Sequence, residues 1–472
     1  MRPFPTRRLH STLIDNRKGG GNRCGHHWPT NFPNVLVRIC AASQVFVKYD
    51  TPPIAFYRNL LDFLEEVLWH MAHLDRHRYV EPHIAQALSF SSIVGVVGQR
   101  QVGKTTTVEK HKPDAYVTLD DDAALSSAQS EPTLFLRHGM QGDNFLLAID
   151  ECQKAPKLFP ALKLYVQRRP RPGQFLLTGS IRFTSRKAIQ ESLTGRIHTI
   201  EMLPMSFAES HRHSLGDIIK ISNSDGEVWR RYLANERDDF SPAKMEKFLL
   251  HGGLPGICFL REQGKRDAKF KSHIETLLQR DIRLIADTSV PYENLRSLLA
   301  YFAAHQGESF NLANAARASQ ISQVTLRKII FAFENLFLLR RLISFGDVTS
   351  PRFYFEDQGM ASYLHGFSPL EDLRRFLFSQ IFNQIHYRYM DVYRVGYFAN
   401  RGGANISFIF EVKKKLFGFD VFEGETPNLS LLRSSESFLK QFPKAVVFLF
   451  SATAKVMKIN ERVKILPLAA VL

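Results

Sequence analysis

The chain has 472 residues, of which 44% are hydrophobic and 12% aromatic. This length predicts several domains of about 100–200 residues each, and this composition excludes a chain that is disordered throughout. Lys and Arg exceed Asp and Glu by 62 − 46 = 16, which favours an anionic partner such as nucleic acid or a membrane surface, although a basic surface can also serve solubility alone. No run of about 18 apolar residues occurs, so we expect no transmembrane helix, no membrane partner and a cytoplasmic location.

The first 52 residues form a basic extension without the apolar core of a secretory signal. They are rich in Gly, Pro and Asn, so we expect a disordered segment, with a transit peptide as the alternative. The four cysteines are Cys24, Cys40, Cys152 and Cys258. No two of them have the C-x-x-C spacing of a zinc or redox site, so we expect free thiols in a reducing compartment.

Four apolar runs, at residues 92–97, 116–119, 145–149 and 174–177, predict buried strands. Helical or polar segments separate these runs, which is typical of a parallel sheet with crossover connections. We therefore predict an α/β domain at residues 53–210. The sequence after it predicts a helical connector at 211–300, short helices and strands at 301–366, and a segment at 367–472 in which strands and helices alternate.

Residues 98–106 contain the pattern G-x-x-x-x-G-K-[ST], which is typical of a phosphate-binding loop. Gly98 and Gly103 let backbone N–H groups turn towards phosphate oxygens, and a helix that begins after Gly103 adds the positive end of its dipole. Lys104 would contact the β- and γ-phosphates of ATP. Thr105 would offer its hydroxyl to Mg²⁺, with Thr106 beside it in the same site. The alternative, a glycine-rich turn with an exposed lysine, is disfavoured by the strand before the motif and the helix after it.

The predicted strand at 145–149 is followed by two carboxylates, Asp150 and Glu151. We expect Asp150 to lie beside the phosphate loop and to hold Mg²⁺ through water. Glu151 would orient and deprotonate the water that attacks the γ-phosphate. The next strand, at 174–177, is followed by hydroxyl groups, and Thr178 and Ser180 are candidates to contact the γ-phosphate.

Three arginines follow that strand: Arg182, Arg186 and Arg196. One of them could neutralise charge in the transition state, either in cis or from an adjacent subunit. We select Arg196 as the candidate catalytic arginine, and the alternative is an arginine that forms surface salt bridges. A contribution from an adjacent subunit would require a homo-oligomer.

Together these motifs resemble those of a bacterial and archaeal AAA-type ATPase family. The resemblance rests on residues 98–106, 148–154, 177–180 and 191–197, and it covers the chain from about residue 55 to the end. It implies an α/β core with the P-loop NTPase fold, a parallel sheet with flanking helices. It also implies a winged helix, here at 301–366, and a small α/β domain that resembles restriction endonucleases, here at 367–472.

Residues 311–330 independently predict two short helices joined by a tight turn at 320–322. Ser322 is the expected N-cap of the second helix. Gln323, Thr325, Arg327 and Lys328 would be exposed on that helix, where they could contact a DNA groove and its phosphates. A module that only contacts proteins is the alternative.

The resemblance to nucleases implies three acidic residues and a lysine around a Mg²⁺ ion that activates water. The matching positions in this sequence are Gln380, Ser407, Asp420 and Phe422. Only Asp420 keeps a carboxylate, and Mg²⁺ prefers carboxylate oxygens. We therefore predict a degenerate nuclease-like domain without nuclease activity.

A rival alignment uses Glu411 and Lys413, with Asp391 upstream, as the metal site. We disfavour it because Glu411 follows Ser407 by four residues, which leaves no room for a turn between two strands. Residues 413–415 instead predict the hairpin that joins strands at 406–410 and 417–422.

From these patterns we expect a Mg²⁺-dependent ATPase that acts as a nucleotide-driven switch, with DNA as a candidate partner. Two alternatives stay open. One is an ATP-dependent nuclease, which requires the Glu411 and Lys413 site, and the other is an ATPase that contacts only proteins.

Overall fold

The computed structural model describes residues 76–142, 144–183, 195–221 and 240–472. The predictions made for residues 1–75, including the start of the α/β domain and two of the four cysteines, lie outside the described residues, and so does Arg186. The other two cysteines, Cys152 and Cys258, are buried free thiols.

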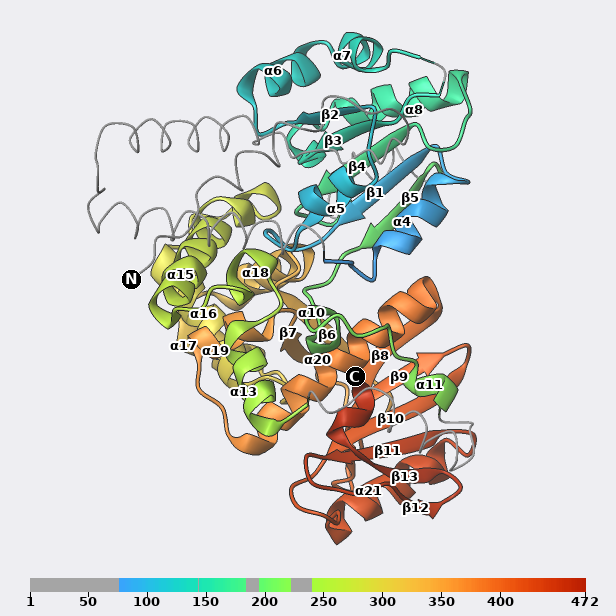
Figure 1. Cartoon of the computed structure of the whole chain (residues 1–472). Helices are drawn as coiled ribbons and strands as arrows, with labels where there is room; N and C mark the ends of the chain where they lie inside the picture. The colour runs from blue at the N-terminus through green and yellow to red at the C-terminus, as the bar shows by residue number, and fades with distance from the viewer. Residues whose placement is uncertain (1–75, 143, 184–194, 222–239) are drawn as a thin grey trace, which may run out of the picture. The chain divides into compact units, whose positions relative to one another are not determined.

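A parallel sheet of five strands forms the first part of the described chain (Figure 1). Its strands are β1 (Ile93–Val97), β2 (Ala115–Thr118), β3 (Leu147–Asp150), β4 (Phe175–Gly179) and β5 (Ile197–Glu201), in the order β2-β3-β4-β1-β5. The four predicted strands are confirmed with shifts of one or two residues. The fifth, β5, was not predicted, because it is an edge strand in which only Ile200 is fully buried, and such a strand shows no continuous apolar run.

Helices connect the strands from β1 to β4, as a parallel sheet requires, and further helices precede β1 and follow β5. They are α4 (Glu81–Leu88), α5 (Lys104–Lys110), α6 (Asp122–Ser130), α7 (Pro132–Gly139), η2 (Cys152–Lys154), α8 (Leu158–Arg168), α10 (Phe207–Ser210) and α11 (Ile218–Ile221). Local signals set their starts. The carboxylate of Asp121 accepts the Ala124 N–H at the N-terminus of α6, and α7 carries Pro132 in its first turn.

The described residues from 240 to 364 form mainly helices, as the sequence predicted. The elements are α13 (Pro242–His251), α14 (Pro255–Cys258), α15 (Gln263–Gln279), η4 (Asp281–Leu284), α16 (Tyr292–Ala304), α17 (Leu312–Ser319), α18 (Gln323–Asn335) and α19 (Gln358–Leu364), with the antiparallel pair β6 (Leu339–Ser344) and β7 (Arg352–Phe355). The predicted pair of helices with a tight turn between them is confirmed: the Ser322 hydroxyl accepts the Thr325 N–H at 3.2 Å and caps α18.

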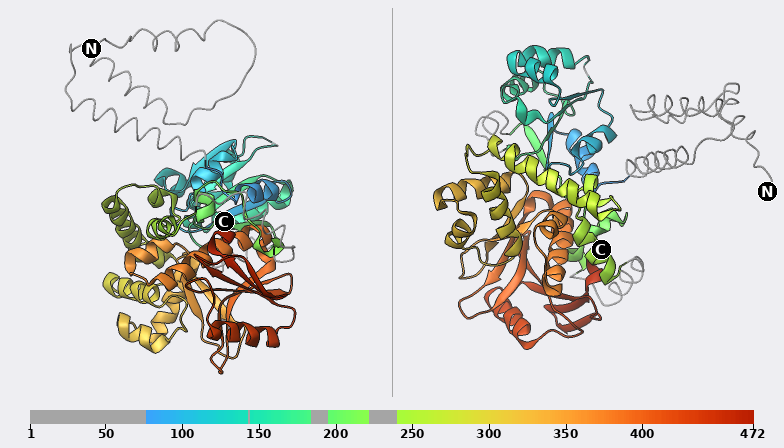
Figure 2. Two further views of the ribbon diagram at one scale, coloured as in Figure 1. Left: turned by 60° about the horizontal axis from the view of Figure 1, so that its bottom comes forward. Right: turned by 90° about the vertical axis from the view of Figure 1, so that its left-hand side faces the viewer.

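A second, mixed sheet of eight strands has the order β12-β13-β11-β10-β9-β8-β6-β7, and Figures 1 and 2 show it apart from the first sheet. Its further elements are α20 (Pro369–Tyr389), η5 (Met390–Val392), β8 (Tyr393–Ala399), β9 (Asn405–Val412), β10 (Lys415–Val421), α21 (Leu429–Gln441), β11 (Val446–Ser451), β12 (Met457–Asn460), β13 (Val463–Pro467) and η6 (Leu468–Val471). Because β6 pairs with β8 at Ile343 and Gly396, this sheet continues across residue 366, where the sequence predicted a domain boundary.

One apolar cluster extends through most of the described chain, from Val94 on β1 through Phe333 on α18 to Phe408 on β9. A second cluster fills the other face of the first sheet, around Phe159 and Phe175. In the described ranges, no helix is long and apolar enough to cross a membrane.

Candidate functional site

The loop between β1 and α5 needs glycine at two positions. A Cβ atom on Gly98 would lie 2.3 Å from the carbonyl oxygen of Met202, which follows β5, so only glycine allows this close approach. Gly103 has a φ of 99°, in the left-handed region that glycine adopts without strain, and it directly precedes the first residue of α5. The backbone of the loop is therefore held where the sheet and the N-terminus of α5 meet.

Lys104 folds back onto this loop. Its Nζ donates hydrogen bonds to the carbonyl oxygens of Gly98 and Gln99, at 3.0 Å each, and the side chain is almost fully buried. Burial lowers the pKa of Lys104, an effect that the nearby Glu151 and Asp150 carboxylates oppose. The ammonium group is thus poorly solvated, and an anion at the loop would stabilise its charged form.

Asp150, the last residue of β3, accepts hydrogen bonds from three hydroxyl groups. Thr105 donates to Oδ2 at 3.0 Å, Tyr116 donates to the same oxygen at 2.7 Å, and Thr178 donates to Oδ1. Thr105 and Asp150 offer hydroxyl and carboxylate oxygens, the ligand type that Mg²⁺ prefers, so these residues fit a Mg²⁺ ion. No group of three or more His, Cys, Asp and Glu side chains in the described residues is arranged to hold a metal. A Mg²⁺ ion shared with nucleotide phosphates needs only one or two protein ligands.

Glu151 follows Asp150 in a left-handed conformation, with a φ of 54°. Its N–H donates to the Thr178 hydroxyl at 3.1 Å, and its Oε2 accepts the Ser180 hydroxyl at 3.0 Å. Gln153 Nε2 donates to the same carboxylate oxygen. The carboxylate is therefore fixed at the carboxyl edge of the sheet, beside the phosphate loop.

Tyr116, Gln153 and Arg78 contact the site, and the sequence interpretation missed all three. Arg78 Nη1 donates to the Val102 carbonyl of the loop at 2.7 Å, and its Nε pairs with buried Glu209 of α10 at 2.8 Å. The polar side chain of Tyr116 within a predicted strand was a usable signal. The pairing of Arg78 with Glu209 joins residues 131 positions apart, and no local pattern reveals it.

Residues of α15 and η4 lie close to the loop. Arg100 Nη1 is 3.7 Å from Asp281 Oδ2, and Asp281 is buried. His273 of α15 is also buried, neither of its ring nitrogens has a hydrogen-bond partner in the described residues, and burial lowers its pKa to about 3. The amide oxygen and nitrogen of the Gln99 side chain are likewise buried without a hydrogen-bond partner in the described residues. This arrangement brings a segment after residue 240 against the phosphate loop.

Arg196 and Arg182 lie at opposite ends of the strands of the first sheet. Arg196 is exposed and directly precedes β5, whose Ile197 pairs with Ile93 at the start of β1. Five strand residues, about 16 Å, thus separate Arg196 from the phosphate loop, and it does not reach its own site in cis. The role in trans stays a prediction. Arg182 follows β4 and therefore lies at the carboxyl ends of the strands, as the phosphate loop does. It pairs with Glu201 at 2.6 Å and stacks over Phe337.

Comparison with known proteins supports this geometry. Residues 91–211 match the model of a family described as an AAA domain. This segment is similar to an AAA domain. It contains the loop, both carboxylates and β5, and similarity of this kind supports nucleotide binding. Residues 242–371 match a second model, described as a domain of unknown function, DUF8612.

Two relatives extend over most of the chain. The uncharacterized protein Rv2008c of Mycobacterium tuberculosis is 24% identical over 390 residues, which cover 78% of this chain and 78% of the relative. The uncharacterized protein MJ1544 of Methanocaldococcus jannaschii is 23% identical over 377 residues, 76% of this chain and 78% of the relative. Among solved structures, a Walker-type ATPase of Pyrococcus abyssi has a TM-score of 0.37 and 13% identity, and the match covers 60% of this chain and 94% of that one.

The second sheet holds the other predicted site residues. Ser407 and Asp420 meet, because the Ser407 hydroxyl and N–H donate to the Asp420 carboxylate at 2.7 and 3.0 Å. Val421 N–H donates to the same carboxylate, which is buried and has a raised pKa because of that burial. Phe422 is buried as well. Asp420 thus accepts three hydrogen bonds from within the protein.

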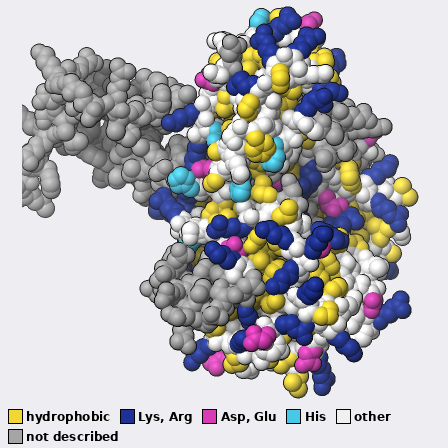
Figure 3. Space-filling view, turned by 90° about the vertical axis from the view of Figure 1, so that its right-hand side faces the viewer, with side chains coloured by type: hydrophobic (Ala, Val, Ile, Leu, Met, Phe, Trp, Pro, Cys, Tyr) yellow, Lys and Arg dark blue, Asp and Glu magenta, His cyan; other side chains and the backbone are white. Residues whose placement is uncertain are grey.

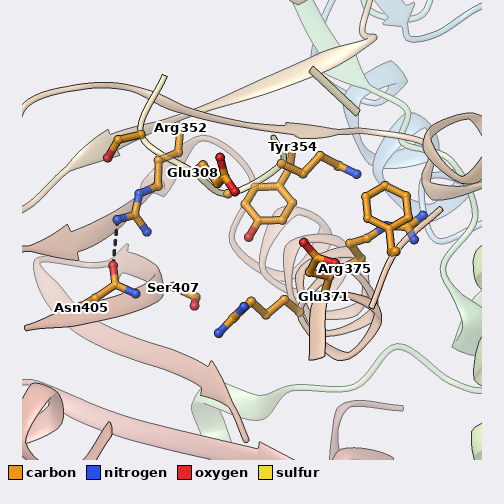
Figure 4. A pocket seen from close by; sticks show the side chains of 12 residues that line it. Glu308, Arg352, Tyr354, Glu371, Arg375, Asn405 and Ser407 are labelled. Atoms are coloured by element: carbon orange, nitrogen blue, oxygen red, sulfur yellow. Dashed lines mark hydrogen bonds between the residues drawn. The ribbon is translucent and has the colours of Figure 1, made fainter. Parts of the chain in front are cut away.

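The prediction for Gln380 is wrong. Phe378 and Phe382 lie on the face of α20 that meets Phe408 and Phe410, and Gln380 projects from the other side of the helix, where it accepts the Ala208 N–H at 3.4 Å. A cavity of about 350 Å³ beside Ser407 is instead lined by Glu371, Arg374 and Arg375 of α20. Figure 4 shows Ser407, Tyr354 and Arg352 around this space, with Arg352 bonded to Asn405.

In the rival metal site, Glu411 and Lys413 are engaged in other contacts, and the side chain of Asp391 lies outside the described part of the chain. Ser407 and Glu411 belong to the same strand, β9, and Lys413 and Lys414 form the turn to β10 with φ values of 50° and 66°. The predicted hairpin is therefore confirmed. Glu411 forms an ion pair with Arg394 of the neighbouring strand at 3.0 Å, and Lys413 lies over the ring of Tyr389.

Proposed function

We propose that this chain is a Mg²⁺-dependent ATPase whose bound nucleotide controls the arrangement of the segments after the AAA domain. One observation carries the proposal. At the carboxyl edge of the first sheet, the buried ammonium group of Lys104, the Thr105–Asp150 pair and the fixed carboxylate of Glu151 converge on one loop. This set offers a phosphate cradle, oxygen ligands and a base within one site.

Each residue has a role in this proposal. The amides of residues 98–106 and the Lys104 ammonium would bind the phosphates, and Thr105 and Asp150 would hold Mg²⁺. The ion would neutralise charge that develops on the phosphates. Glu151 would orient the attacking water and take its proton. Thr178 would hold the Asp150 carboxylate and the Glu151 backbone in place through its hydrogen bonds.

We propose the following domain organisation, with boundaries from the sequence. The core spans 53–210, a helical connector 211–300, a winged helix 301–366 and a degenerate nuclease-like domain 367–472. The order α16, α17, α18 and the hairpin β6–β7 supports the winged helix. The hydrogen-bonded Ser407–Asp420 pair supports a domain that does not cleave nucleic acid.

Nucleotide titration of Lys104→Ala tests the proposal. Because the ammonium group is a direct phosphate contact, we expect a loss of ATP affinity of at least about tenfold. Exposed Lys157 of the same domain is the matched control, and Lys157→Ala should bind ATP as the parent chain does. An ATP affinity of Lys104→Ala equal to that of the parent chain would contradict the proposal.

DNA is the candidate partner that α18 supports. Gln323, Arg327 and Lys328 are exposed on its first turns, while Thr325 is half-buried. We expect Arg327→Gln/Lys328→Gln to weaken duplex binding at every sequence and to reduce its salt dependence, because side chains that contact phosphates release counterions. Metal-dependent DNA cleavage that is lost in Glu411→Ala would instead support the nuclease alternative.

A further inference from the structure

A strongly basic groove lies between α10, α13 and α14, away from the residues of the proposed ATPase site. Its volume is about 680 Å³, and its thirteen lining residues include five cationic side chains and no Asp or Glu. The cationic residues are Arg76, Arg212, Lys244, Lys247 and Arg261. His211 and His251 line it as well. Figure 3 shows one face of the molecule, over which Lys and Arg side chains are spread.

Three cations of the groove are available to a ligand. Arg212, Lys247 and Arg261 are exposed, and they form no ion pair with the described residues. They come from three separate segments: Arg212 follows α10, Lys247 belongs to α13 and Arg261 follows α14. Their charges therefore converge only in the folded chain, where mutual repulsion opposes folding unless an anion offsets it.

The inner wall of the groove is also positive and partly apolar. Arg76 stacks over Phe259 at 4.2 Å from the ring centre and donates to the Ser210 carbonyl. Burial, followed by the charge of Arg212, lowers the pKa of Arg76. Phe248 and Cys258 are buried in the floor. A basic groove with aromatic side chains suits a strand that presents phosphates outwards and apolar sugar or base surface inwards.

We propose that this groove binds the phosphodiester backbone of a nucleic acid strand, with Arg212, Lys247 and Arg261 as its phosphate contacts. The site is separate from α18 and goes beyond the proposed ATPase activity. A single inorganic phosphate would engage only part of a groove of this size. A flat anionic membrane would meet the rim cations and would leave the floor empty.

The groove is connected to the phosphate loop through two short segments. Arg76 precedes Arg78 by two residues, and Ser210 directly follows Glu209. Arg78 holds the Val102 carbonyl of the loop and pairs with Glu209. A nucleic acid strand bound against Arg76 and Ser210 would therefore act on the neighbouring ion pair of Arg78 and Glu209, which supports the loop. We expect such binding to change the rate of ATP hydrolysis.

The test compares two triple variants of the full chain. Arg212→Gln/Lys247→Gln/Arg261→Gln removes the groove cations. Arg433→Gln/Lys440→Gln/Lys444→Gln removes three exposed cations at α21 and β11, so both variants lose the same net charge. A fluorescent single-stranded oligonucleotide of about 20 nucleotides and its duplex are titrated by anisotropy at several salt concentrations, because each strand phosphate contributes about 0.7 to the slope of log K against log salt.

We expect the groove variant to lose at least about tenfold in affinity at low salt and to lower the slope by about 2, which corresponds to three phosphates. The control variant should keep the slope of the parent chain. The groove variant should also retain basal ATP hydrolysis, which shows that it is folded, and should lose the effect of the oligonucleotide on that rate.

Three results would overturn the proposal. The first is a groove variant with the same affinity and slope as the parent chain, and the second is a parent chain that binds neither oligonucleotide at low salt. The third is loss of binding to vesicles of anionic lipid with unchanged oligonucleotide binding. Lys104→Ala separates this site from the ATPase, since it should lose ATP binding and keep oligonucleotide binding.

Discussion

Glu151 combines a left-handed backbone with a carboxylate held by Ser180 and Gln153. A non-glycine residue in this region costs about 1 kcal/mol or more, and such strain is common at functional sites. The strain turns the residue after β3 so that its N–H meets Thr178. At the scale of single residues, the site therefore depends on orientation as much as on residue type.

Glu151→Gln tests whether this carboxylate acts as the base. The amide keeps the shape of the side chain and one acceptor oxygen for Ser180 and Gln153, but it cannot take a proton, so we expect hydrolysis to fall about 10²–10⁴-fold. ATP affinity should stay within about threefold of the parent value. Phosphate release and a nucleotide titration measure the two effects. A variant that still hydrolyses ATP at the parent rate would exclude Glu151 as the base.

His273 should make the folded chain sensitive to acid. Burial lowers its pKa to about 3, whereas an unfolded histidine titrates near 6.5. The unfolded chain therefore binds the proton first as the pH falls. The stability that neutral His273 contributes is fully present above about pH 6.5 and is lost progressively as the pH falls towards 3, by about 2 kcal/mol at pH 5.

His273→Leu should remove this part of the pH dependence. The difference in unfolding free energy between pH 7.5 and pH 5, from urea denaturation, should shrink by about 2 kcal/mol. Exposed His138→Leu is the control and should behave as the parent chain does. An unchanged pH dependence in His273→Leu would show that the buried ring does not titrate in this way.

At the scale of elements, α18 and α20 use their polar residues differently. The Ser322 cap fixes where α18 begins and leaves Arg327 and Lys328 exposed. Helix α20 begins at a capping box formed by Ser368 and Glu371. Its buried polar residues reach the backbone that follows β5: Tyr387 accepts the Leu203 N–H at 2.9 Å and Gln384 accepts the Ile218 N–H at 3.2 Å. Polar residues within α20 thus serve packing between elements.

Ser322→Ala should destabilise α18 by about 1 kcal/mol, because one N–H of the first turn loses its acceptor. Chemical denaturation measures the change. Ser322→Asp, which restores an acceptor, should recover most of the loss. ATP hydrolysis should not change in either variant, and an effect on nucleotide binding would contradict a purely local role for the cap.

At the scale of the whole molecule, partly buried charges join the first sheet to the second. Arg340 of β6 pairs with Glu201 of β5 and, at 2.6 Å, with Glu356, and Arg182 pairs with Glu201 from the other side. Burial raises the pKa of Glu356, although Arg340 opposes the effect. Burial also acts to raise the pKa of Glu201, but Arg182 and Arg340 outweigh it and hold that pKa far below its usual range.

Arg340→Leu should lower the free energy of unfolding by about 3 kcal/mol, because it removes the nearest cation of Glu356 and leaves Glu201 with Arg182 alone. Glu356→Gln should be much milder, since burial already raises the pKa of Glu356 and the amide keeps the volume of the side chain. Urea denaturation at pH 7 compares the two variants. Equal effects of both would mean that the pairing of charges does not determine this contact.

The sequence by itself determined the features that depend on neighbouring residues. Apolar runs predicted four of the five strands of the first sheet. The glycines and Lys104 predicted the phosphate loop, and Ser322 predicted the start of α18. Such signals are local, because a strand, a turn or a cap involves only a few consecutive residues. The same kind of local signal predicted that Asp150 and Glu151 lie at the carboxyl end of a strand.

Only the tertiary structure decided which distant side chains meet. It brought Tyr116 to Asp150, placed Arg196 at the edge of the sheet opposite the loop, and turned Gln380 away from Ser407. It also gathered the groove cations from three segments. These outcomes depend on strand order and on which face of a helix is packed. Contacts between residues far apart in the chain fix both, and no short sequence pattern records them.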